Sequence, residues 1–161
     1  MFRIAMSLLA LVTTASQAQV TLSATPLSGE QVSAFYIARG FSATDIAPYA
    51  QACVLSFEFR NADRATLRFR LAEWQTGDGI GLQPLADWDA TWDRRGVSLA
   101  ARTAFRWSQF PAEQEFEPGD WIMGMAALTR RPSAKFSLIA RYDDAKGQHE
   151  IILDPLSCAG D

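Results

Sequence analysis

The feature that most constrains the fold is an alternation of apolar and polar residues that begins at Cys53. Apolar side chains occupy every second position over residues 53–59 and again over 67–71. Successive side chains of a β-strand point to opposite faces of a sheet, so this period predicts strands with one buried face. The short connection predicts that the two runs form a hairpin, with an odd number of loop residues so that both apolar sets share one side.

Further strands are expected towards the C-terminus. Residues 97–107 alternate as a strand would, and the surrounding β pattern favours a strand although their composition also suits a helix. The run 121–129 is apolar on both faces and predicts a central buried strand, while 135–142 and 148–153 predict a final hairpin. Six or seven strands joined by turns indicate a mainly β chain, an antiparallel β-sandwich of immunoglobulin-like architecture.

Two short helices are expected ahead of these strands, over residues 28–52. Ser28 and Gln31 have the spacing of a capping box, in which each side chain bonds to the backbone of the other residue. The second helix would direct Ile46 and Tyr49 towards the core.

Residues 1–18 have the three parts of a secretory signal peptide. Arg3 supplies a positive charge, residues 4–12 form an apolar run too short to span a bilayer, and small residues lead up to Ala18. Cleavage after Ala18 would leave a single domain of residues 19–161. We therefore expect a periplasmic or secreted protein.

Two cysteines, Cys53 and Cys158, remain in that mature chain. A lone pair of cysteines in an oxidising compartment usually forms a disulfide. Neither a Cys-x-x-Cys spacing nor a set of histidines supports a redox or metal role for them. We therefore predict one disulfide between Cys53 and Cys158.

The charge balance bears on the class of partner. The whole chain has a net charge of −3, and loss of Arg3 with the signal peptide makes it more negative. Nucleic acids and anionic membranes bind basic surfaces, so the balance argues against both as partners. After residue 18 no apolar run is long enough for a membrane span. The expected partner is another periplasmic protein or a small ligand.

The least regular part of the chain, residues 77–95, carries the candidate binding residues. Trp88 and Trp92 lie four positions apart, followed by Arg94 and Arg95. Tryptophan and arginine are enriched at binding hot spots, and such sites often lie on loops. These four residues are therefore a candidate binding surface. The alternative is that both tryptophans fold back onto the sheets as a lid.

A copper site is the second hypothesis. Met123 and Met125 are two apart on an expected strand, so their thioethers would point the same way, and thioether sulfur suits Cu(I). His149, the single histidine, is a possible third ligand. Methionine is also a common core residue. On this competing interpretation the two methionines pack in the core, and the protein has no cofactor.

Enzymatic activity has less support in the sequence. No nucleophile elbow, triad or phosphate-binding glycine loop is visible, and a hydrolase would have to use scattered carboxylates. The leading hypothesis is a non-catalytic exported binding or accessory protein. Copper handling and hydrolysis are the two alternatives.

Overall fold

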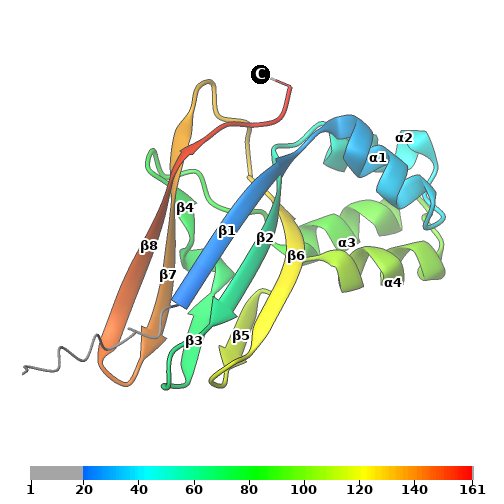
Figure 1. Ribbon diagram of the computed structural model, residues 1–161. Helices are drawn as coiled ribbons and strands as arrows, with labels where there is room; N and C mark the ends of the chain where they lie inside the picture. Colours follow the sequence, from blue (N-terminus) through cyan, green and yellow to red (C-terminus); the bar gives the residue numbers. More distant parts are fainter. Residues whose placement is uncertain (1–19, 161) are drawn as a thin grey trace, which may run out of the picture.

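The computed structural model describes residues 20–160, which form a mainly β chain with antiparallel sheets and helices on one side (Figure 1). The expected signal peptide, residues 1–18, lies outside the described residues. No described helix is long and apolar enough to cross a membrane.

The strands form two sheets. The first has the order β1–β2–β6, with bounds Val20–Leu27, Val54–Asn61 and Trp121–Ala127. The second contains β3 (Leu67–Arg70), β4 (Gln75–Thr76), β5 (Glu113–Phe116), β7 (Phe136–Asp144) and β8 (Gly147–Leu156), with β7 pairing β3, β4 and β8. A short 3₁₀ turn, Leu71–Glu73, follows β3. The expected hairpin near the C-terminus is confirmed as β7 and β8.

The two sheets enclose the main core. Phe57 and Phe59 of β2 point inwards from the first sheet, and Phe69 of β3 faces them from the second, with 5.3 Å between the Phe59 and Phe69 ring centroids. Trp74 fills the space between these rings and donates its indole N–H to the Arg141 carbonyl at 2.8 Å.

The predicted hairpin between residues 53–59 and 67–71 is wrong. β2 pairs with β1 and β6, whereas β3 pairs with β5 and β7 in the other sheet. Both apolar sets do face one core, but from opposite sides. Alternation states which face of a strand is buried, and two facing sheets meet that condition as well as one hairpin does.

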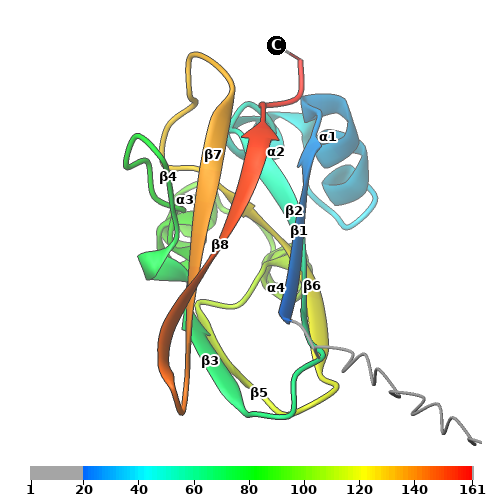
Figure 2. The same cartoon turned by 60° about the vertical axis from the view of Figure 1, so that its left-hand side comes forward.

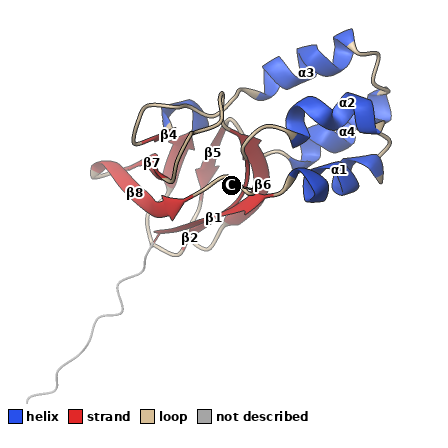
Figure 3. Cartoon of the chain, turned by 90° about the horizontal axis from the view of Figure 1, so that it is seen from above, coloured by secondary structure: helices blue, strands red, loops and turns tan. Residues whose placement is uncertain are grey.

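The outer face of the first sheet carries a second core beneath four helices: α1 (Gly29–Ile37), α2 (Ala43–Ala50), α3 (Leu85–Arg94) and α4 (Leu99–Ser108). Viewed from above, all four helices lie on one side of the sheets, next to β6 and β1 (Figure 3). Val54, Met125 and Ala127 form the sheet side of this core.

Two elements differ in kind or place from their predictions. The Ser28 capping box is present, with Gln31 N–H donating to Ser28 Oγ at 3.1 Å, but α1 and α2 follow β1 and do not open the fold. β6 is not a central strand, because it has a neighbouring strand only on its β2 side within the described sheet, and its outward residues Trp121 and Met123 are exposed.

Residues 97–107 are also not a strand, because most of them belong to α4. Ser98 caps the helix by accepting a hydrogen bond from the Ala101 N–H, and Ala101 and Phe105, four apart, are buried. The other members of the alternating set within α4, which are Leu99, Thr103 and Trp107, are exposed. Apolar residues at every second position also occur at every fourth position, and residues four apart share one face of a helix. The pattern alone therefore fits both a strand and a helix.

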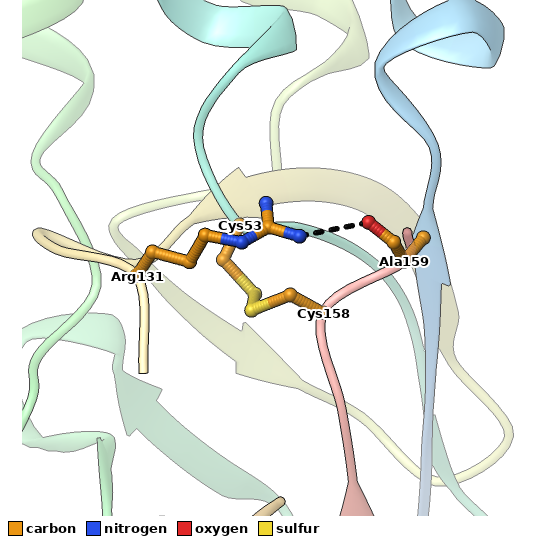
Figure 4. Close-up of a disulfide and its surroundings, with 4 residues drawn as sticks. All are labelled: Cys53, Arg131, Cys158 and Ala159. Atoms are coloured by element: carbon orange, nitrogen blue, oxygen red, sulfur yellow. Dashed lines mark hydrogen bonds between the residues drawn. A yellow bond between two sulfur atoms is a disulfide. The ribbon is translucent and has the colours of Figure 1, made fainter. Parts of the chain in front are cut away.

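A disulfide joins the start of β2 to the segment after β8, as the sequence predicts. Cys53 precedes β2 and Cys158 follows β8, with 5.3 Å between their Cα atoms, and both are buried (Figure 4). Beside this bond Arg131 Nη2 donates to the Ala159 carbonyl at 2.9 Å. The last residues are thereby attached to the start of β2.

Candidate binding groove

The candidate binding residues Trp88 and Trp92 lie inside the helical layer. The segment expected to be irregular contains α3, and both indoles point from it into the second core, stacked with centroids 5.5 Å apart. Trp92 packs edge-on against Phe41 and Phe105. This placement corresponds to the lid alternative, with the lid formed by helices.

Arg94 and Arg95, by contrast, are exposed at the end of α3. Arg94 Nη2 donates to Thr91 Oγ1 at 3.2 Å, and Arg95 Nη1 donates to the Thr44 carbonyl of α2 at 3.2 Å. The four residues therefore do not share one surface, since the two indoles are inside and the two guanidinium groups are outside.

The three candidate copper ligands do not converge. Met123 and Met125 lie on the outward face of β6, whereas His149 lies on β8 in the other sheet, where its Nε2 is 2.9 Å from Asp144 Oδ1. Figure 2 shows β8 and β6 separated by β1 and β2. The hydrogen bond from His149 lowers the pKa of Asp144. Any copper site at the methionines would need ligands other than His149.

Sequence reasoning missed an open groove of about 610 Å³ between α1, α4 and β6. α1 supplies Phe35, α4 supplies Trp107, and β6 forms the base with Met123 and Met125. The remaining lining residues are Leu27, Gln31, Val32, Arg39, Ser56, Ala104, Ser108 and Gly124. The volume lies within the range of small-molecule pockets, which are also mostly apolar.

Two large apolar side chains are exposed at the rim of this groove. Trp107 has 86% of its surface exposed and Met123 has 57%. The exposure of Trp107 follows from the position of α4, whose buried face is set by Ala101 and Phe105. Exposed large apolar groups that line a concavity are a feature of binding sites more than of bare surface.

Beside the groove, a chain of hydrogen bonds links α1, α2 and the end of α4. Tyr49 Oη donates to Gln109 Oε1 at 3.0 Å, and Gln109 Nε2 donates to Tyr36 Oη at 2.8 Å. Tyr36 Oη lies 2.6 Å from Ser108 Oγ, and Ser108 Oγ donates to the Phe105 carbonyl at 2.7 Å. Each group has a partner, so the network fixes α1, α2 and the end of α4 relative to one another.

Burial keeps both phenols protonated. It raises the pKa of Tyr36 to about 12, against the opposite effect of the hydrogen bonds with Ser108 and Gln109. Burial also raises the pKa of Tyr49 well above its usual value. The hydrogen-bond network beside the groove is therefore neutral in the physiological pH range.

The base of the groove depends on a glycine. A Cβ atom at Gly124 would lie 2.6 Å from the Phe110 backbone nitrogen and 2.7 Å from the Gln109 carbonyl carbon. This close approach allows the Phe110 N–H to donate to the Met125 carbonyl at 2.8 Å. The end of α4, and with it Trp107, is thereby attached to β6.

The lining of the groove is mostly apolar and carries little charge. The lining residues include no carboxylate, imidazole or thiol, and Arg39 is their only charged group. Throughout residues 20–160, no three His, Cys, Asp or Glu side chains are grouped so as to hold a metal ion. The groove can therefore bury an apolar molecule and offer it one positive charge.

Comparison with known proteins finds no matching family model, no matching curated protein and no matching solved structure.

Proposed function

We propose that this chain is an exported, non-catalytic binding protein that holds an apolar ligand in the groove between α1, α4 and β6. The observation that carries the proposal is a preformed apolar groove with Trp107 and Met123 exposed at its rim. Burying such side chains against a ligand contributes about 25 cal/mol per Å² of apolar area removed from water. The hydrogen-bond network beside the groove holds α1 and the end of α4 in place before binding, which reduces the conformational cost of binding.

Export is part of the proposal. The Cys53–Cys158 disulfide and the signal-like pattern of residues 1–18 both suit an oxidising compartment. We further propose that the two sheets around one core are a β-sandwich scaffold for the groove. The immunoglobulin-like arrangement expected from the sequence stays a prediction.

The groove is tested by titrating the full chain with a neutral apolar fluorophore, N-phenyl-1-naphthylamine. Trp107→Ala should weaken binding about tenfold or more, as the loss of a hot-spot side chain does. Leu99→Ala is the matched control, because Leu99 is also exposed on α4 but does not line the groove. Equal affinity of the wild type and Trp107→Ala would contradict the assignment.

Export is tested separately by producing the chain with its own N-terminal segment in a Gram-negative host. The periplasmic fraction should contain a protein that begins at Gln19, as measured by intact mass. A full-length chain found only in the cytoplasm would contradict export without bearing on the groove.

A further inference from the structure

We infer that the ligand of the groove is a single-chain amphiphile with an anionic carboxylate head, bound with that head at Arg39. This inference rests on the proposed function and specifies its ligand class. The starting observation is that the groove is apolar apart from a few neutral polar groups and one charge.

The Arg39 guanidinium is held in place before any ligand binds. Its Cζ lies 3.4 Å from the centroid of the Phe35 ring, and Nη1 donates to the Phe35 carbonyl at 2.7 Å. A guanidinium has five N–H donors, and this contact uses one of them. The remaining donors can bind a carboxylate in the two-point geometry that arginine favours.

No carboxylate of residues 20–160 forms an ion pair with Arg39. The ion pairs formed within residues 20–160 involve other side chains, and Arg39 is not among them. Several other arginines do form such pairs, for example Arg106 with Asp89 at 2.8 Å. What distinguishes Arg39 is that it lines the groove and forms none of these ion pairs.

The polarity of the groove gives the ligand a direction. Phe35 and Arg39 are four positions apart, so Arg39 marks the end of the groove towards the C-terminus of α1. At the β6 end, Met123 is directly opposite Glu58 of β2, and Glu58 is exposed. Arg60, opposite Trp121, is exposed on the same face as Glu58, so the direction rests on the attraction of an anionic head to Arg39, with the apolar tail over Met123 and Trp107.

Three probes of equal chain length separate head-group recognition from apolar binding. Decanoate, decanol and decyltrimethylammonium, each below its micelle concentration, compete with the naphthylamine fluorophore on the full chain. Decanoate should bind about tenfold more tightly than decanol, because hydrogen bonds to a charged group are stronger than neutral ones. The cationic probe should bind most weakly of the three.

The matched variants are Arg39→Gln, Arg39→Lys and Arg94→Gln. Arg39→Gln should abolish the preference for decanoate while the neutral fluorophore still binds, and Arg39→Lys should keep part of the preference because it keeps the charge. Arg94→Gln removes an exposed arginine outside the groove and should change nothing. Thermal unfolding of each variant verifies that it is folded.

The outcomes distinguish this inference from the proposed function. Equal binding of decanoate and decanol, or an unchanged preference in Arg39→Gln, would overturn the carboxylate inference while fluorophore binding still supports the groove. Failure of the fluorophore to bind the wild type would overturn both.

Discussion

At the scale of single residues, Trp88 and Trp92 show how burial and sequence context can disagree. Both lie among Asp, Gly and Arg, a composition typical of an exposed loop. Both are nevertheless buried, and neither indole N–H has a hydrogen-bond acceptor among the described residues. Such unpaired donors carry a cost, so the aromatic packing around them must outweigh it.

Trp92→Ala should therefore lower the free energy of unfolding by roughly 3–5 kcal/mol, the usual cost of removing a buried aromatic side chain. Trp92→Phe should cost distinctly less, because it keeps much of the packing and removes the unpaired N–H. Trp107→Ala is the control of the same residue type, and its exposed side chain should change stability by about 0.5 kcal/mol at most. Urea denaturation of the three variants measures this, and a Trp92→Ala variant as stable as Trp107→Ala would show that Trp92 is not in the core.

The raised pKa of Tyr36 predicts that the protein loses stability in alkaline solution. The native phenol keeps its proton up to a pKa of about 12, whereas in the unfolded chain it ionises near pH 10. Below pH 10 both states are protonated, so this contribution is fully present, and it declines as the pH rises from about 10 to 12. The total loss from this residue is about 3 kcal/mol.

Denaturation measured between roughly pH 9 and pH 11 should show that decline, and Tyr36→Phe should reduce its slope because one titrating group is gone. The slope should not vanish, since the pKa of Tyr49 is raised as well. An identical slope in the wild type and Tyr36→Phe would mean that the Tyr36 phenol has the same pKa in the folded and the unfolded state.

At the scale of helices and strands, hydrophobic periodicity predicted burial faces better than pairing. The alternation in β2 and β3 correctly identified their inward residues, but which strands pair depends on contacts distant in the sequence. The capping box at Ser28 is a local signal and correctly marked the start of α1. Local features such as helix caps and buried strand faces could therefore be predicted from the sequence, whereas the pairing of strands could not.

The groove was not predictable for the same reason. It requires α1, α4 and β6 to meet, and α4 was expected to be a strand. Trp107 appeared as one member of an alternating set and Met123 as part of a run that is apolar on both faces, with nothing in the sequence to show that they lie at one rim. The one usable signal was the four-residue spacing of Ala101 and Phe105 after Ser98, which is typical of a capped helix.

Gly124→Ala tests the attachment of α4 to β6. The added methyl group would collide with the backbone of Gln109 and Phe110, which a side-chain movement cannot relieve, so stability should fall by about 1–3 kcal/mol. Gly81→Ala is the control, because a Cβ atom there meets nothing within 4 Å. The affinity for the naphthylamine fluorophore should fall in Gly124→Ala and stay constant in Gly81→Ala. Equal stability of both variants would show that the close approach is unimportant.

At the scale of the whole molecule, the disulfide closes a loop that contains every described strand except β1. The two cysteines are 105 positions apart, and a cross-link over such a loop stabilises the folded state by about 4–5 kcal/mol on chain-entropy grounds. The bond also fixes the C-terminal segment at the start of β2 (Figure 4). In the helical layer, α1 and α2 precede this loop and α3 and α4 lie within it, and all four helices share the second core.

The double variant Cys53→Ala with Cys158→Ala should accordingly lose up to about 4–5 kcal/mol of stability. Alanine is chosen because both sites are buried and a serine hydroxyl would need a partner there. Alkylation of the native wild-type protein without reductant, followed by intact-mass measurement, is the companion test. Two labelled thiols on folded protein would contradict the bond.

The central claim is that the groove between α1, α4 and β6 is the binding site, and the methionines report on it directly. The chain has four methionines, of which Met123 and Met125 line the groove and Met1 and Met6 precede the described residues. In a protein labelled with ¹³C at the methionine methyl groups, titration with N-phenyl-1-naphthylamine should shift the Met123 and Met125 signals with one saturating curve. Met1 and Met6, where that segment is retained, should not shift. Binding of the fluorophore with both groove methyl signals unchanged would contradict the claim.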